Sequence, residues 1–228
     1  MAAGAKQAER SRKGFQVKDP VSAGTHFAGF ILAIIATPIM LVHVVHCTSR
    51  GIDVFGYAVF MASMIALYAA STIYHTFDRS EKVNRTLKKI DHCMIFFLIA
   101  GTYTPICITI LNPKTGLIIG ALVWGVGIAG VIFKLFWVYC PRWVSTAIYV
   151  TMGWICVLAF GQMIPGMGMA SFGWLLAGGI MYTIGGIIYA LKLPLLERRF
   201  PGFGAHELFH CFVIAGTAFQ YISLFIMI

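Results

Sequence analysis

The chain has 228 residues, of which 59% are apolar and 11% are charged, and its mean hydropathy is +0.85. A soluble domain of this length cannot hide so much apolar surface, so we expect lipid to be its solvent. The formal net charge is +9. The basic residues nevertheless form short clusters between apolar runs, without a stripe of interleaved aromatic residues, and this pattern argues against nucleic-acid binding.

The order of polar and apolar segments predicts an all-α integral membrane protein. Residues 1–19 are polar and basic and are expected to form a disordered cytoplasmic tail. Asp19 and Pro20 then predict a helix N-terminus, with aspartate as the N-cap and proline at the first helical position. Residues 20–228 are expected to form one seven-helix transmembrane domain. The predicted spans are 21–46, 54–77, 90–111, 115–139, 143–164, 170–191 and 204–228.

Two features of this division depend on particular residues. The charge-free stretch between Arg142 and Lys192 is too long for one helix, and the segment Pro165-Gly166-Met167-Gly168 is expected to break it into two spans. Glycines inside the spans, namely Gly125, Gly178, Gly179, Gly185 and Gly186, are interpreted as points of close helix packing.

The distribution of basic residues predicts the orientation in the membrane. Of the 17 Lys and Arg residues, all except Arg50 and Lys114 lie in the tail, in the connectors after spans two and six, or near the connector after span four. Cytoplasmic segments carry this excess of positive charge. We therefore expect a cytoplasmic N-terminus and an extracytoplasmic C-terminus.

The segment His206-Glu207-Leu208-Phe209-His210 opens the last apolar run. Histidines four residues apart lie on one face of a helix, so both rings can reach one ion. A histidine pair bonded to nearby hydroxyls and carbonyls is the alternative. In the predicted topology, His75 at the end of span two and Asp91 at the start of span three lie at a similar depth, which favours a metal site.

Three histidines leave one tetrahedral position open, as in catalytic zinc sites, and imidazole ligands suit zinc. Asp91 is expected either to bind the metal or to act as a base on a bound water. Ser71, one turn before His75, is placed to orient a ring or an oxyanion, or else to bond its own helix carbonyl. His26 is either a supporting, cavity-lining residue or an ordinary interfacial histidine, and His92 is expected to point elsewhere.

Three blocks of sequence resemble the hemolysin III group of the progestin and adiponectin receptor superfamily. They are Ser71-x-x-x-His75, the segment from Ile90-Asp91-His92-Cys93 to Pro105, and His206-x-x-x-His210. The resemblance implies a seven-helix bundle with zinc held by His75, His206 and His210, and with Asp91 acting through a bound water. It also implies kinship with membrane enzymes that hydrolyse lipid amides. The expected location is the plasma membrane, here the inner membrane of a bacterium.

Three functions follow as hypotheses. The first is a zinc-dependent hydrolase of lipid amides or esters at the cytoplasmic side, with membrane lipid as substrate and no soluble partner. The second is a non-enzymatic cytolysin or regulator of membrane state, in which zinc is a structural clamp. The third is an intramembrane metalloprotease, because His-Glu-x-x-His is also a zinc-protease signature in which Glu207 would be the base, although no acidic ligand follows His210. The substrate and the oligomeric state stay open.

Overall fold

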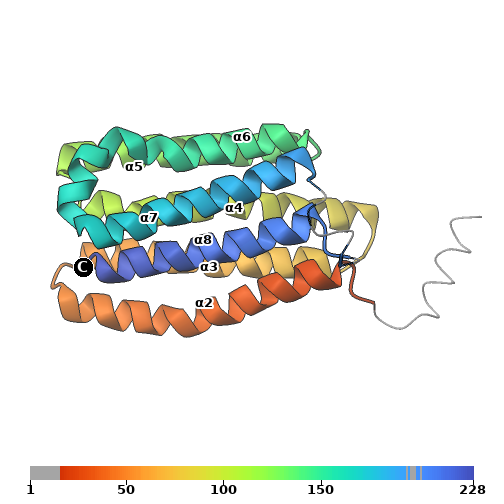
Figure 1. Cartoon of the computed structure of the whole chain (residues 1–228), viewed down its shortest axis with the longest axis horizontal. Coiled ribbons are helices and arrows are strands. Elements are labelled where there is room, and N and C mark those ends of the chain that lie inside the picture. The colour runs from red at the N-terminus through yellow and green to blue at the C-terminus, as the bar shows by residue number, and fades with distance from the viewer. Residues whose placement is uncertain (1–15, 194, 196–198, 201) are drawn as a thin grey trace, which may run out of the picture.

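The computed structural model describes residues 16–193, 195, 199–200 and 202–228, and all the regular elements among them are helices. They form an elongated bundle along one long axis, with the C-terminus at one end (Figure 1). Most of the expected tail, residues 1–15, lies outside the described residues. The elements in chain order are α2 (Pro20–Cys47), α3 (Gly51–Thr76), α4 (Glu81–Thr109), α5 (Pro113–Phe136), α6 (Arg142–Gly153), the 3-10 helix η1 (Trp154–Ala159), α7 (Phe160–Leu191) and α8 (Ala205–Ile226).

The lengths and surfaces of these helices are those of a multi-pass membrane protein. Six helical stretches are long and apolar enough to cross a bilayer. Large apolar side chains on the outer faces are exposed, for example Phe27 at 52%, Leu117 at 75% and Phe136 at 82%. Helices satisfy their backbone polar groups internally and can therefore present such surfaces to lipid. The expectation of a membrane-embedded, all-helical chain is confirmed.

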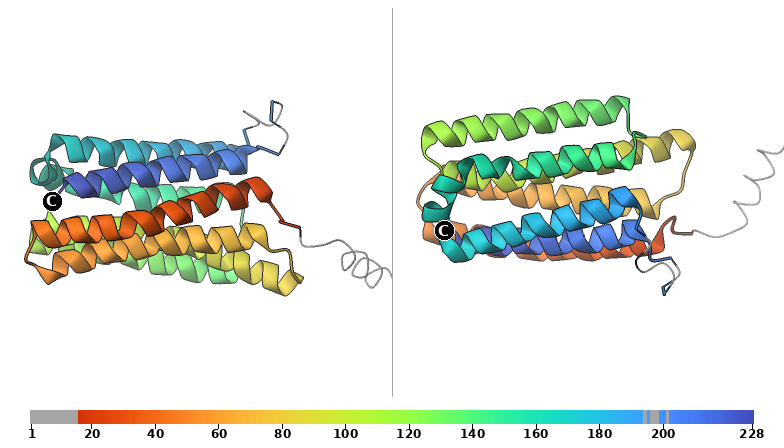
Figure 2. Two further views of the ribbon diagram at one scale, coloured as in Figure 1. Left: turned by 90° about the horizontal axis from the view of Figure 1, so that it is seen from below. Right: turned by 45° about the horizontal axis from the view of Figure 1, so that its top comes forward.

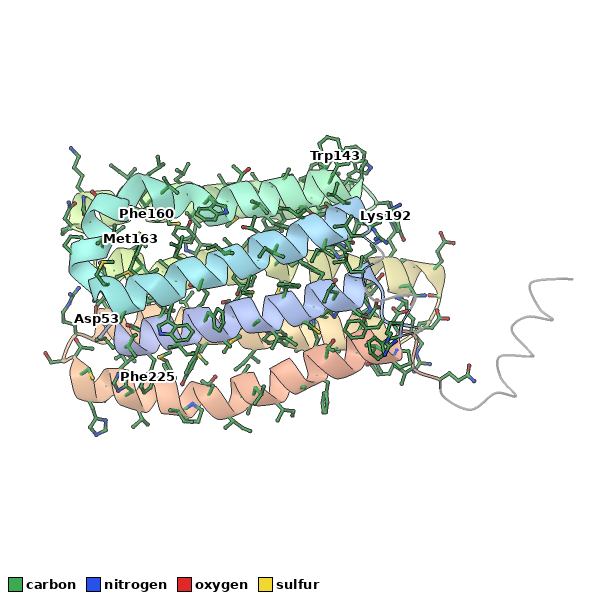
Figure 3. The ribbon with its side chains drawn as sticks, in the orientation of Figure 1. Asp53, Trp143, Phe160, Met163, Lys192 and Phe225 are labelled. Carbon is green, nitrogen blue, oxygen red and sulfur yellow. The ribbon has the colours of Figure 1, made fainter. Side chains whose placement is uncertain are left out.

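The stretch from Arg142 to Leu191, 50 residues long, folds back on itself. Trp143 and Lys192 lie at one end of the bundle, and Phe160 and Met163 lie at the other (Figure 3). The interruption is at Gly168, whose φ of 76° and ψ of 156° are outside the helical region. Glycine adopts a positive φ without the steric cost of a Cβ. The break therefore falls at the last residue of the predicted segment, whereas Pro165 stays within the helix.

The segment expected to be a basic connector before the third span is helical instead. Helix α4 begins at Glu81, and Ser80 caps it by accepting a hydrogen bond from the Val83 N–H at 3.4 Å. The predicted span begins at residue 90, because the prediction rests on apolar character. The first turns of α4 are polar, and the helix extends past the apolar part of the bundle (Figure 2).

Only some of the glycines expected to allow close helix packing have a neighbouring helix next to them. A Cβ added at Gly178, Gly185 or Gly186 would collide with a neighbouring helix, whereas Gly125 and Gly179 have no neighbour within 4 Å. The interpretation is therefore right for the first three glycines and wrong for the other two, because periodicity does not determine which way a glycine faces. The tightest backbone contact is elsewhere, at Gly116 of α5, where a Cβ would overlap the Cys107 carbonyl oxygen of α4.

Gly116→Ala is expected to destabilise the protein by about 1–3 kcal/mol, because a backbone carbonyl cannot move aside for the added methyl group. Gly125→Ala, on the same helix with open space around it, is the matched control and should leave stability unchanged or slightly raised. The thermal midpoint in detergent measures both. Equal midpoints for the two variants would contradict the packing described at Gly116.

Candidate metal site

The start of α2, the end of α3 and the start of α8 lie at the same end of the bundle (Figures 1 and 2). This arrangement brings together three histidines that are far apart in the sequence. His75 lies in the last turn of α3, and His206 and His210 lie in the first two turns of α8. His75 and His210 are each 2% exposed, and His206 is half-buried.

The three imidazole rings face one another. His75 Nε2 and His206 Nε2 are 3.2 Å apart, and the ring centroid of His210 lies 5.1 Å from that of His75 and 4.5 Å from that of His206. One ligand atom from each ring lies within 4.8 Å of the others. Two nitrogens bound tetrahedrally at roughly 2.0–2.1 Å from a metal would be about 3.3–3.4 Å apart. The cluster is therefore able to hold a divalent metal ion.

Asp19 fixes the orientation of the His75 ring. Its Oδ2 lies 2.9 Å from His75 Nδ1, and its backbone N–H donates to the His75 carbonyl at 2.8 Å. An imidazole that donates its Nδ1–H to a carboxylate presents Nε2 as the free lone pair for a metal. Asp19 occupies the predicted N-cap position, but its side chain makes no capping hydrogen bond. That part of the prediction is wrong, because the carboxylate bonds the imidazole instead of the helix amides.

Other residues of α2 support His210. The hydroxyl of Thr25 lies 3.4 Å from His210 Nδ1, and the ring of His26 stacks on that of His210 with centroids 3.6 Å apart. Of the two alternatives for His26, the structure thus supports the supporting, cavity-lining residue and not the ordinary interfacial histidine. Asp19, Ser22 and His26 recur at spacings of three and four, and this polar stripe beside and within an apolar helix is the sequence signal for their role in the site.

Glu207 joins α8 to α2. It accepts hydrogen bonds from the Ser22 hydroxyl at 2.8 Å and from the Gly204 backbone N–H at 2.9 Å. The second bond caps the N-terminus of α8, where a carboxylate also interacts favourably with the helix dipole. The carboxylate between the two histidines is therefore occupied in positioning the helix that carries them.

Asp91 and Ser71 lie beside the cluster rather than within it. Asp91 on α4 is 7% exposed and Ser71 on α3 is 1% exposed, and neither belongs to the group of convergent ligand atoms. Of the two alternatives for Ser71, the bond to its own helix carbonyl is not formed, because its hydroxyl has no hydrogen-bond partner. His92 Nδ1 lies 3.0 Å from Asp91 Oδ2. The expectation that His92 points elsewhere is wrong, because its side chain bends back toward the preceding residue.

A cavity of about 690 Å³ opens beside the histidines and extends into the middle of the bundle. Its lining includes all five site residues named from the sequence, together with His26 near the cluster and Tyr103, Tyr182 and Gln220 deeper inside. Among the described residues, buried side-chain polar atoms of His26, Ser71 and Gln220 have no hydrogen-bond partner. All three residues line this cavity. Buried polar atoms are rarely left unpaired, which indicates a cavity that takes water or a polar ligand.

The fold and the site define a class: a helical membrane protein with a three-histidine cluster at one end, open to an internal cavity. The chain belongs to the haemolysin III family, within the progestin and adiponectin receptor superfamily; the family model described as "Haemolysin-III related" matches residues 15–221.

Three relatives show the extent of the similarity. The chain is 32% identical over 206 residues to the hemolysin-3 homolog of Bacillus subtilis, covering 90% of this chain and 92% of that protein. It is 33% identical over 210 residues to hemolysin-3 of Bacillus cereus, covering 91% and 90%. It is 30% identical over 193 residues to the adiponectin receptor protein of Drosophila melanogaster, covering 74% of this chain but 41% of that protein.

His75→Ala is expected to abolish tightly bound metal, because two imidazoles alone form a weak site. Asp19→Ala is expected to keep the metal but to lower its affinity about 10–100-fold, since the ring loses its orienting carboxylate. Elemental analysis and chelator titration of the purified proteins measure both effects. His46→Ala is the control, because His46 is exposed and bonds only its own helix, at the Val42 carbonyl. Asp19→Ala and His46→Ala with equal affinities would contradict the role given to Asp19.

Proposed function

We propose that His75, His206 and His210 hold a zinc ion, and that the protein is a zinc-dependent hydrolase of lipid amides or esters. The observation that carries the proposal is the convergence of three imidazoles on a cavity large enough for a lipid chain. Imidazole nitrogens suit zinc better than magnesium or calcium, which prefer oxygen ligands. Three protein ligands leave one position for a substrate or water, as in catalytic zinc sites.

The proposed topology has seven crossings, with the N-terminus in the cytoplasm and the C-terminus outside the plasma membrane of a bacterium. The reversal at Gly168 supports two crossings between Arg142 and Leu191. The bacterial relatives support the location. The excess of basic residues near the histidine end supports this orientation, because positive residues stay on the cytoplasmic side.

A reporter fused after Ile228 tests the orientation. Alkaline phosphatase, which is active only outside the cytoplasm, is expected to be active in that fusion. The matched control is a fusion after Asn84, in the polar first turn of α4 at the histidine end, which is expected to be inactive. The opposite pattern of activities would place the histidine cluster on the outer side and overturn the topology.

A bound zinc would supply Lewis-acid polarisation of a carbonyl and would acidify a water molecule. The residues of this chain would perform the other steps. Asp91, which His92 contacts, would take a proton from the attacking water and return it to the leaving amine or alcohol. The unpaired hydroxyl of Ser71 would donate a hydrogen bond to the developing oxyanion. The apolar depth of the cavity would bind the acyl chain.

Asp91→Asn is expected to lower the release of fatty acid from a lipid amide by at least about 100-fold, because the general base is lost. Glu207→Gln should have a mild effect, since glutamine preserves the acceptor that caps α8. A panel of short and long N-acyl lipids, incubated with purified protein and analysed by mass spectrometry, measures both. Wild-type protein that releases no acid from any of these lipids in the presence of zinc would refute the hydrolase.

A structural role for the metal is the second candidate function, in a cytolysin or a regulator of membrane state. The observation that favours it is that the histidines join α3 to α8, which an ion would clamp together. The names of the two Bacillus relatives point the same way. Under this alternative, metal removal lowers the thermal midpoint while membrane effects survive His206→Ala. The protease alternative is weaker, because the Glu207 carboxylate already accepts two hydrogen bonds within the protein.

A further inference from the structure

A second polar cluster lies on another wall of the same cavity, around Lys134 near the end of α5. Lys134 is 1% exposed, although lysine is among the residues least often buried. Its ammonium group donates to the Ser145 hydroxyl and to Cys140 Sγ, the latter at 3.2 Å. These acceptors carry no charge. A buried cation is costly unless a negative charge accompanies it.

Among the described residues, no carboxylate lies within ion-pair distance of Lys134. The acids that line the cavity have other partners. Asp19 contacts His75, Asp91 contacts His92, and Glu207 accepts hydrogen bonds from Ser22 and Gly204. The negative charge that Lys134 needs must therefore come from outside this set of side chains.

Three further cations line the cavity: Lys88 within α4, Arg142 at the start of α6 and Lys192 just after α7. With Lys134 they form a basic wall of the cavity. Tyr189 connects this basic wall to the histidines. The Arg142 guanidinium lies 4.8 Å from the centroid of the Tyr189 ring, and that ring lies 5.4 Å from the ring of His206. Arg142 of the basic wall and His206 of the histidine cluster thus lie on either side of one aromatic side chain.

We propose that this basic wall binds the phosphate of a lipid headgroup, so that the substrates of the proposed hydrolase are phosphate-bearing lipids. This inference rests on the proposed function and specifies its substrate class. A phosphate has several acceptor oxygens and up to two negative charges, which matches a donor set of several cations and a hydroxyl better than a single carboxylate would. Arginine and lysine near a headgroup also attract anionic lipid.

The order of groups along the cavity agrees with such a lipid. Lys134, Arg142 and Lys192 lie at the ends of α5, α6 and α7, which in the proposed topology are at the membrane surface, where a headgroup resides. The histidines and Asp91 are beside them, where an amide or ester linkage would follow. The deeper lining, which includes Tyr103 and Tyr182, then surrounds the acyl chain.

Binding can be tested without turnover, by native mass spectrometry of the full chain in a neutral detergent. The probes are dihexanoyl phosphatidic acid, dihexanoylglycerol as its neutral match, and inorganic phosphate. The wild-type protein is expected to bind the phosphatidic acid at least about tenfold more tightly than the glyceride, and inorganic phosphate only weakly. Lys134→Met should remove the preference, because one charge-assisted hydrogen bond contributes about that factor.

Lys114→Met is the matched control, because Lys114 is an exposed lysine at the opposite end of α5 and should leave the preference intact. If Lys134→Met fails to fold, Arg142→Gln at an exposed position and Lys134→Arg, which keeps the charge, replace it. Equal affinity for the two lipids, or an unchanged preference in Lys134→Met or Arg142→Gln, overturns the proposal. Inorganic phosphate binding as tightly as the lipid overturns the lipid assignment.

His206→Ala separates this inference from the metal site. It should abolish hydrolysis but keep the preference for phosphatidic acid, because the headgroup contacts other residues. Loss of the preference in His206→Ala would place the phosphate on the metal and refute the basic wall. A preserved preference in a wild-type protein that hydrolyses nothing would refute the hydrolase alone.

Discussion

Lipid as a solvent is the constraint on which the rest of this structure depends. In a bilayer, backbone groups must form their hydrogen bonds within each helix. The chain therefore folds into helices that span a similar distance, and their ends lie in two layers at the two ends of the bundle. Side chains at helix ends therefore meet whatever their distance in the sequence. His75 and His206, separated by 131 residues, come within 3.2 Å for this reason.

Polar groups are distributed unequally between the two ends. At the end near the C-terminus, the buried carboxylate of Asp53 accepts hydrogen bonds from Thr48 and Thr109. Near the histidine end, unpaired polar atoms of His26 and Ser71 face a cavity. An unpaired buried polar group destabilises the fold, and packing alone gives no reason for its presence. This difference is the physical reason for assigning function to one end.

Helix α2 has an unexpected part in the site. Most of its surface faces outward, yet its N-cap and first two turns contact two of the three histidines and Glu207. Asp19 holds the ring of His75, Ser22 holds Glu207, and His26 stacks on His210. Helix α2 and its N-cap therefore support His75 on α3 and His210 on α8. A metal site on two helices alone would leave these rings free to rotate.

The sequence by itself determined the solvent, the helical class and the gathering of the histidines at one end of the bundle. Hydropathy requires lipid, and the spacing of His206 and His210 places both on one helical face. The positions of His75 and Asp91 at ends of apolar runs predicted that they would lie near that face. These properties follow from local periodicity and from the requirement that each span cross the same thickness of membrane.

Only the tertiary structure decided how the side chains are oriented. The rotation of each helix about its axis depends on packing, so periodicity could not show that Asp19 bonds His75 in place of capping α2, or that His92 bends toward Asp91. The same holds for Lys134, which looked like a residue at the end of a span and is buried in the cavity wall. Contacts between helices distant in the chain decide these features, and no local pattern contains them.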